Sequence, residues 1–262
     1  MKPNELCPCL DAVFPATPTA EALTRLAGLG FRRFEFWDWR QQDVGALARV
    51  AADAGLSAVI FSGNTFEEPL VDRAAHGQVL AHLRRSLEVA EELGVRLLTV
   101  HVGYPLPGRS REEQWAAAVE GLRAAGDLAA TAGVTLALEP LNSRVDHPGY
   151  FLDMLPDALR ILAEAGHPAV RLLLDVYHMR VMHEDLLDRL PAALSATAHV
   201  HVADVPGRGE PGSGAIPWTA VMDALRAGGY RGAVGLECRP TGPAEAALRR
   251  CVEVLGAVRV SW

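Results

Sequence analysis

The segment VRLLLDVYHM, residues 170–179, joins a run of apolar residues to an acid and then to a helix-like stretch. Three other segments share this design, in which an acidic residue or a histidine stands at the end of an apolar run: VTLALEP (134–140), AHVHVAD (198–204) and AVGLE (233–237). Parallel strands of one barrel bring the side chains at their carboxyl ends to a common mouth. The four segments therefore predict one site built from distant parts of the chain.

Strand-like runs and amphipathic segments alternate along all 262 residues. Eight strands, the number in a closed barrel, are predicted at about 6–13, 32–37, 56–62, 96–102, 134–139, 170–175, 198–203 and 232–237. Helices are predicted near 19–29, 42–54, 75–93, 111–132, 154–165, 184–195, 217–227 and 242–257. An open doubly wound sheet would show the same alternation, but the chain has no glycine-rich nucleotide fingerprint. We therefore expect an α/β fold, a (β/α)8 TIM barrel, as a single domain over residues 1–262.

The composition limits the partners and the location of the protein. The formal net charge is -7, so no broad basic field is available to attract a polyanion, and we expect a small-molecule substrate and no nucleic acid. No apolar stretch reaches the roughly 18 residues of a membrane span, and the first residues do not resemble a signal peptide. These features predict no membrane partner and a cytoplasmic location, where the four cysteines would be free thiols.

Four residues are candidate metal ligands, namely Glu139, Asp175, His201 and Glu237. Three carboxylates and an imidazole in one apolar pocket would repel or neutralise one another, and a divalent cation keeps them ionised. Oxygen ligands with one imidazole suit Mn²⁺, Mg²⁺ or Co²⁺. Each carboxylate taken alone has a simpler explanation, because acids at strand-to-helix junctions often cap the next helix. The coincidence of all four favours the metal site.

The same pocket could move a proton between carbon atoms. A substrate that chelates the cation through adjacent oxygens has a polarised carbonyl and a more acidic neighbouring C–H bond. Glu139 and Glu237 are the candidate catalytic pair, one removing the proton and the other returning it. Three further residues are candidates for binding the substrate: His178, Arg208 and His101. Glu35 also falls at a strand end and is expected to line the pocket, whereas His199 lies two residues before His201 on the same face of its strand and is expected to be structural or to support a ligand.

The ordered series LALEPLN, LLLDVYHM, HVHVAD followed by GRGEPGSGAI, and GLECRP resembles the hydroxypyruvate isomerase family, within the xylose-isomerase-like sugar isomerases and epimerases. The resemblance covers essentially the whole chain. It implies a barrel whose metal is held by Glu139, Asp175, His201 and Glu237, with the two glutamates working through an enediol. By the same likeness His178 and Arg208 hold the substrate, and the reaction is hydroxypyruvate to tartronate semialdehyde.

Several other functions remain open at this point. A 2-oxo-tetronate isomerase and a ketose 3-epimerase would use the same two glutamates, and His201 stands where some hydroxypyruvate isomerases have glutamine and the ketose epimerases have histidine. A metal-dependent DNA-repair endonuclease is more remote, because the chain is acidic. A non-enzymatic binding barrel is the last alternative. Likeness to the family also makes a homo-oligomer possible.

Overall fold

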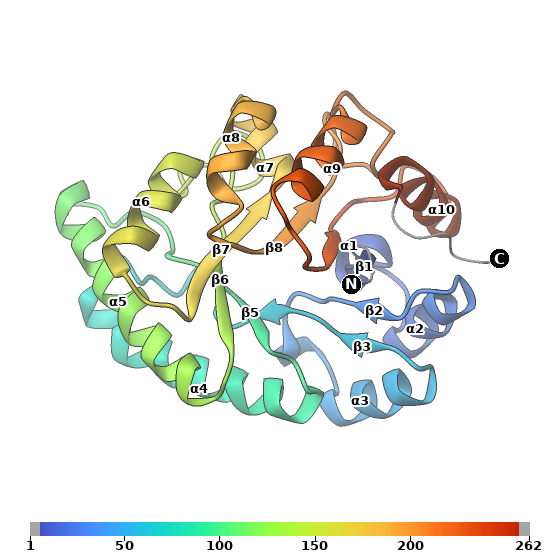
Figure 1. Ribbon diagram of the computed structural model, residues 1–262. Helices are drawn as coiled ribbons and strands as arrows, with labels where there is room; N and C mark the ends of the chain where they lie inside the picture. Colours follow the sequence, from blue (N-terminus) through green and yellow to red (C-terminus); the bar gives the residue numbers. More distant parts are fainter. Residues whose placement is uncertain (1–5, 257–262) are drawn as a thin grey trace.

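The computed structural model describes residues 6–256, and its centre is a curled parallel sheet (Figure 1). Within these residues seven strands follow the order β1-β9-β8-β7-β6-β5-β4. They are β1 (Leu6–Pro8), β4 (Phe61–Ser62), β5 (Leu97–Val100), β6 (Thr135–Leu138), β7 (Val170–Asp175), β8 (Thr197–Val202) and β9 (Val234–Leu236). All neighbouring pairs are parallel. The carboxyl ends of the strands therefore share one edge, as the sequence pattern requires.

Two short strands complete the barrel between β1 and β4. β2 (Arg33–Phe34) pairs with β3 (Ser57–Ala58), and β3 and β4 are two parts of one extended run. A parallel bridge between Cys9 and Glu35 joins β2 to β1, and the Glu35 amide donates to Pro8 O over 3.0 Å. Counting β3 and β4 as one position, the described residues supply eight positions, and the expected α/β barrel is confirmed.

One predicted strand is wrong in its second half. The run 6–13 forms a strand only over Leu6–Pro8, and the chain then turns into α1 (Leu10–Val13). Leu10 N still donates to Glu35 O over 2.8 Å, but Val13 N donates to Cys9 O over 2.9 Å and Phe14 N to Leu10 O over 2.8 Å, so the backbone bonds after Leu10 are those of a helical turn. A continuous apolar run has the same pattern whether it is buried as a strand or as a short helix, and periodicity alone does not separate them.

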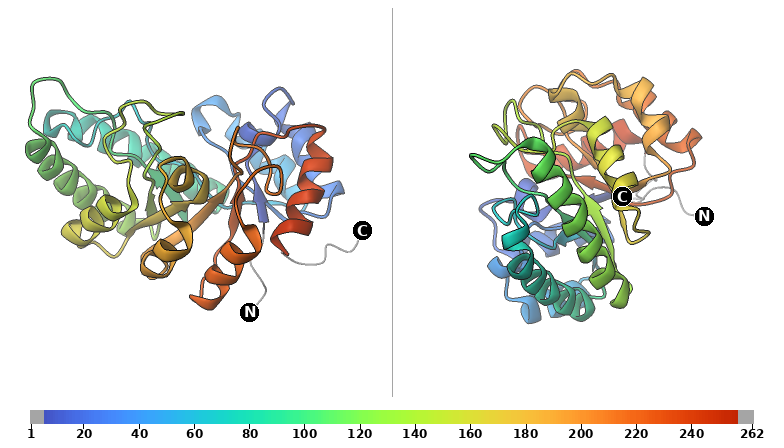
Figure 2. Two further views of the ribbon diagram at one scale, coloured as in Figure 1. Left: turned by 90° about the horizontal axis from the view of Figure 1, so that it is seen from above. Right: turned by 90° about the vertical axis from the view of Figure 1, so that its left-hand side faces the viewer.

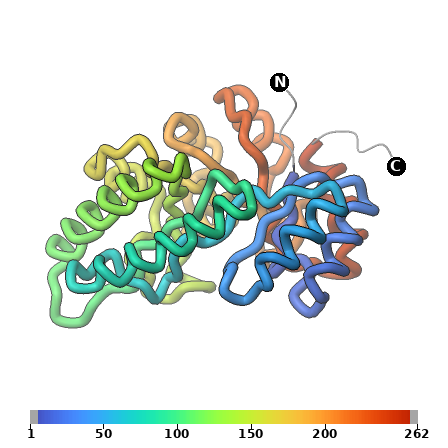
Figure 3. Tube along the Cα trace, turned by 90° about the horizontal axis from the view of Figure 1, so that it is seen from below, coloured from blue at the N-terminus to red at the C-terminus, as the bar shows by residue number. Residues whose placement is uncertain are grey.

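The helices form an outer layer around the strands (Figures 1 and 2). They are α2 (Thr19–Gly28), α3 (Val44–Asp53), α4 (His76–Leu93), α5 (Arg111–Thr131), α6 (Leu155–Ala165), α7 (Val176–Val181), α8 (Leu186–Ala193), α9 (Trp218–Ala227) and α10 (Ala244–Leu255), with 3-10 turns at Trp39–Gln41 and Arg73–Ala75. The layer brings α2 and α10 close together (Figure 3), and Arg25 of α2 pairs with Glu245 of α10 at 2.5 Å. No helix within residues 6–256 is long and apolar enough to cross a lipid bilayer.

The barrel interior is apolar in the middle and polar at the carboxyl edge. Ile60, Ala137 and Leu173 are buried together inside the sheet. Glu139 follows β6, and Asp175 is the last residue of β7. Each lies two residues beyond a member of this apolar cluster, on the same face of the sheet and nearer the carboxyl edge. The residues outside 6–256 are not described, and the domain limits 1–262 stay a prediction.

Candidate active site

Three of the predicted metal ligands converge at the carboxyl edge of the barrel. Glu139, Asp175 and Glu237 come from the ends of β6, β7 and β9, and each offers an oxygen within 4.8 Å of the others. His178, two residues into α7, places a ring nitrogen within the same distance. All four side chains are buried. The structure thus brings together a group that could hold a metal ion.

His201 lies beside this group and contacts its two glutamates. Its Nδ1 atom is 3.3 Å from Glu139 Oε1 and 3.4 Å from Glu237 Oε2. His201 is therefore adjacent to the proposed acid and base, whereas His178 is closer to Asp175, with 3.6 Å between Nε2 and Oδ2. Either imidazole could complete the donor set, and we keep His201 as the proposed ligand because its Nδ1 meets two carboxylates at once.

Unpaired polar atoms show that a cation fits this donor set. Among residues 6–256, Glu139 Oε1 and both ring nitrogens of His201 are buried and have no well-aligned hydrogen-bond partner. Buried polar atoms are rarely left without a partner, because water must be stripped from them on folding. Carboxylate oxygens and an imidazole nitrogen are ligands that Mn²⁺, Mg²⁺ and Co²⁺ accept. A divalent cation would therefore satisfy atoms that this chain leaves unsatisfied.

The buried charges balance one another through alternating sign. Burial alone would raise the pKa of Glu139, but His101 and His201 bring it well below its usual value. Burial alone would lower the pKa of His201, but Glu35 and Glu237 raise it well above the usual value. Without a cation the imidazole therefore holds a proton between carboxylates. A cation bound at Nδ1 would displace this positive charge.

Glu237 is the most strongly held carboxylate of the site. Its Oε2 accepts a hydrogen bond of 2.5 Å from Arg208 Nη2, and its Oε1 accepts one of 2.5 Å from Trp37 Nε1. Burial would raise the pKa of Glu237, but Arg208 and His201 lower it far below the ordinary range. Glu237 therefore remains ionised and fixed, whereas Glu139 keeps one oxygen without an aligned partner.

Asp175 has two separate roles. Its Oδ1 accepts from the amide of His178 over 3.0 Å and so caps α7, which is the simpler explanation considered for this residue. Its Oδ2 is 3.6 Å from His178 Nε2 and 3.9 Å from Arg208 Nη2, on the side of the site. Burial raises the pKa of Asp175, although His178 and Arg208 oppose the effect. The helix cap and the site residue are the same side chain.

His178 has a defined tautomer because of Asn142. Both the backbone amide and the side-chain amide of Asn142 point at His178 Nδ1, over 3.1 Å and 2.6 Å. A nitrogen that receives two donors is an acceptor, so the proton of the neutral ring is on Nε2. That N–H faces the site, where it can donate to a substrate oxygen. The sequence pattern gave no sign of Asn142 beyond its place in LALEPLN.

A buried aspartate shapes the loop that carries Arg208. Asp204 Oδ1 accepts from Val205 N and Ile216 N, and Oδ2 accepts from Gly212 N and Trp218 Nε1, over 2.9–3.0 Å. Arg208 itself has a left-handed backbone, with φ 59°. The folded loop places its guanidinium over the Tyr177 ring, 5.1 Å from the centroid. Arg208 therefore forms ion pairs with the carboxylates of the site and is also a candidate for binding the substrate.

The remaining expectation concerns His101, which is held in place by Asn64. His101 Nε2 lies 3.4 Å from Glu139 Oε2, so it contacts the proposed base directly. Asn64 donates to His101 O and accepts from His101 N, each over 2.9 Å. Asn64 follows a strand in a loop, yet it is 1% exposed and lines the same cavity. A loop residue is buried here because it fixes the end of β5.

The site opens into a cavity of about 450 Å³, large enough for a small ligand. Glu139, His178, His201, Arg208 and Glu237 are on its wall. Aromatic side chains form much of the rest of the wall, including Phe36, Trp37, Phe61, Phe66 and His147. Burial and the neighbouring His178 lower the pKa of His147 to about 4, so this ring is neutral near pH 7.

Comparison with known proteins identifies the family. The family described as xylose isomerase-like TIM barrel matches residues 23–257. The chain belongs to this family. A human family member, provisionally named hydroxypyruvate isomerase, is 32% identical over 275 aligned residues, which cover 100% of this chain and 96% of the human protein. The hydroxypyruvate isomerase of Escherichia coli (strain K12) is 29% identical, covering 86% of this chain and 89% of that protein.

A solved structure of the family agrees in fold. The crystal structure of an AP endonuclease, family 2, from Brucella melitensis superposes with a TM-score of 0.85 at 29% identity, covering 95% of this chain and 98% of that chain. Together these family members confirm the predicted family and an enzyme of the aldose–ketose isomerase type.

Proposed function

We propose that this protein is a divalent-metal-dependent isomerase of a short hydroxy-keto acid, with hydroxypyruvate, converted to tartronate semialdehyde, as the first candidate. The observation that carries the proposal is the meeting of Glu139 and Glu237 at one nitrogen of His201, at 3.3 Å and 3.4 Å. Two buried carboxylates on different strands can then address neighbouring carbons of one ligand. Glu139, Asp175, His201 and Glu237 would hold the cation, which supplies polarisation of the substrate's carbonyl and hydroxyl oxygens.

The two glutamates differ in a way that assigns their roles. Glu237 has both oxygens engaged, by Trp37 and Arg208, whereas Glu139 keeps Oε1 without an aligned hydrogen bond. Glu139 is thus the better placed base and takes the proton from C3 of the substrate. The electron pair forms a C2–C3 double bond, which gives an enediol, and the hydroxyl proton passes from O3 to O2. Glu139, which now holds the proton from C3, returns it to C2 and so yields the aldehyde, while Glu237 stays ionised beside Arg208.

His178 and Arg208 support this transfer from one side. The Nε2–H of His178 faces the site and can donate to the oxygen on which charge develops. Arg208 Nη2 is 3.5 Å from that nitrogen and keeps Glu237 ionised. Neither residue needs to move for this role, because Asn142 and Asp204 fix them.

An acidic substrate is favoured by one arginine at the cavity wall. Three arginines line the cavity, and two of them pair with carboxylates of the chain: Arg40 with Asp38 and Arg208 with Glu237. The Arg239 side chain has no carboxylate partner within residues 6–256 and stands two residues beyond Glu237 at the exposed rim. A ligand carboxylate would supply the missing anion. A neutral ketose would not.

Solvent deuterium exchange tests the proposal. Full-length protein loaded with Mn²⁺ is incubated in D₂O with hydroxypyruvate, 2-oxo-tetronate or a neutral ketose, and products are followed by NMR. We expect deuterium at carbon and conversion of a keto acid to its aldehyde isomer. Exchange with inversion in a ketose alone would establish a 3-epimerase instead. Cleavage of DNA with an abasic site and no exchange in any small molecule would establish an endonuclease.

A further inference from the structure

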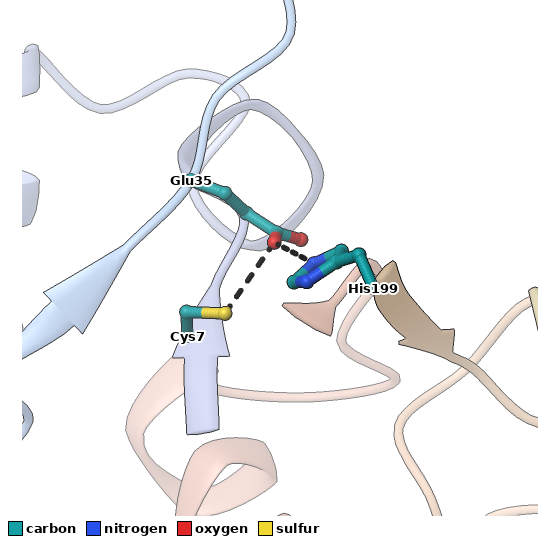
Figure 4. A group of neighbouring side chains, drawn as sticks. All are labelled: Cys7, Glu35 and His199. Atoms are coloured by element: carbon teal, nitrogen blue, oxygen red, sulfur yellow. Dashed lines mark hydrogen bonds and ion pairs between the residues drawn. The ribbon is translucent and has the colours of Figure 1, made fainter. Parts of the chain in front are cut away.

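A second buried group lies directly below the site and is not used by the reaction described above. It consists of Cys7 on β1, Glu35 after β2 and His199 on β8 (Figure 4). Glu35 Oε2 accepts from His199, with 3.0 Å to Nε2, and from Cys7, with 3.5 Å to Sγ. Because Oε2 already has two partners inside the protein, the group is a hydrogen-bonded unit rather than an open ion site.

The other oxygen of Glu35 faces the active site. Glu35 Oε1 has no aligned hydrogen-bond partner within residues 6–256, and it lies 3.4 Å from His201 Nε2. The opposite nitrogen of the same ring, Nδ1, is the atom between Glu139 and Glu237. Glu35 therefore stands behind His201, on the far side of the ring from the proposed cation.

A glycine makes this contact possible. Glu35 follows β2, whereas His201 is on β8, so β1 and β9 lie between them in the barrel. Gly235 of β9 is in register with His201 on one side and with Cys7 on the other. A Cβ atom at Gly235 would come within 2.5 Å of Glu35 Oε2 and 2.6 Å of His201 Cδ2. Because Gly235 has no side chain, the Glu35 side chain can extend past β9 and contact His201.

From these contacts we propose that Glu35 is a positioning residue that holds the Nε2–H of His201 and so directs Nδ1 at the cation. The inference rests on the cation site of the proposed function. A metal-binding imidazole commonly donates its second N–H to a carboxylate, which fixes both the tautomer and the ring orientation. Here His199 and Cys7 hold the rear oxygen, and Gly235 leaves the passage. The His201 ring therefore has one orientation in which Nε2 faces Glu35 and Nδ1 faces the proposed cation.

Two substitutions test the role from opposite directions. Glu35→Gln keeps the shape but removes the charge, and Gly235→Ala keeps every polar group but fills the passage. We expect each to weaken Mn²⁺ binding by about 10- to 100-fold, the usual effect of losing such a partner. The matched controls are Glu184→Gln, a buried glutamate that accepts from Leu155 N away from the cavity, and Gly77→Ala, where a Cβ meets no atom within 4 Å.

Calorimetric titration of Mn²⁺ into EDTA-treated full-length protein gives the dissociation constants, and thermal unfolding shows that each variant folds. At saturating Mn²⁺ the substrate KM should match the parent, because Glu35 does not touch substrate in this proposal. Parent-like Mn²⁺ affinity in Glu35→Gln would overturn the inference. If that variant does not fold, parent-like affinity in Gly235→Ala overturns it equally. Absence of Mn²⁺ binding by the parent contradicts the cation site itself, which is a different failure.

Discussion

Arg208 Nη2 donates to Glu237 Oε2 over 2.5 Å, and both groups are buried at the carboxyl edge of the barrel. The pair explains how a carboxylate can remain charged there, since an unpaired buried anion would take up a proton instead. It also distinguishes the two glutamates of the proposed catalytic pair, because Arg208 occupies Glu237 Oε2, whereas Glu139 Oε1 has no aligned hydrogen-bond partner within residues 6–256. The asymmetry between Glu139 and Glu237 is thus a property of their neighbours.

The first prediction concerns these two glutamates. Glu139→Gln and Glu237→Gln should each lower kcat by about 10²- to 10⁴-fold at saturating Mn²⁺, because the first removes the proton carrier and the second leaves Arg208 without its buried anion. Deuterium exchange at C3 should disappear in Glu139→Gln. Glu184→Gln is the control, since Glu184 is equally buried but lies outside the cavity. Normal C3 exchange in Glu139→Gln would show that another group is the base.

The second prediction is the pH dependence of stability in EDTA-treated protein. The pKa of His201 is raised by folding, so its contribution is fully present below the unfolded value of about 6.5 and is lost as pH rises through the folded pKa. The pKa values of Glu139 and Glu237 are lowered, so their contribution is present above about 4.3 and is lost on acidification. Thermal unfolding between pH 4 and 9 should therefore show its highest midpoint on the acid side of neutral.

Two controls make this pH profile specific. Mn²⁺ should remove the decline above neutral pH, because the cation replaces the proton of His201 as the positive charge. His201→Gln should also flatten the alkaline side, since the amide does not titrate. If the unfolding midpoint of His201→Gln falls equally above neutral pH, the decline is caused by a group other than His201.

The third prediction concerns substrate charge. Arg239→Met should raise the KM for hydroxypyruvate by about tenfold, the value of one charge-assisted hydrogen bond near the surface, and leave kcat nearly unchanged. Arg144→Met is the control, because Arg144 is exposed on a loop and does not line the cavity. Steady-state kinetics at saturating Mn²⁺ measures both. An unchanged KM would mean that the carboxylate binds elsewhere.

The fourth prediction concerns the loop anchored by Asp204. Asp204→Asn replaces one acceptor oxygen by an amide, which leaves two of the four donors without an acceptor. The free energy of unfolding should fall by about 2–3 kcal/mol, as expected for buried donors that lose their partner. Urea unfolding measures it, with the exposed Asp223→Asn as control. A loss no larger than that of the control would show that the loop is held by other contacts.

The alternation of apolar runs was sufficient to predict the barrel and the convergence of Glu139, Asp175 and Glu237. The reason is geometric, because parallel strands in a closed sheet must end at the same edge. The short strands β2 and β3 and the early helix α1 were harder to predict, since a few buried apolar residues have the same pattern in either structure.

The supporting contacts were beyond sequence reasoning for a different reason. Glu35 was noticed at a strand end, but its reach to His201 depends on the absence of a side chain at Gly235 and on a path across two other strands. Asn142 acts through the orientation of an amide, and Asn64 through burial of a loop. These contacts form only in the folded barrel, and the periodicity of the sequence does not predict them. The cytoplasmic location and a homo-oligomeric state likewise stay predictions.

Asp175 offers one oxygen to the site while its other oxygen holds the first turn of α7. Rotating the carboxylate to accommodate a wider coordination sphere would therefore break the start of a helix. Bidentate coordination by Asp175, which is common for Ca²⁺ with its six to eight oxygen ligands, would require that rotation. If the proposed cation site is occupied, a compact ion would thus be favoured because of how the following helix begins.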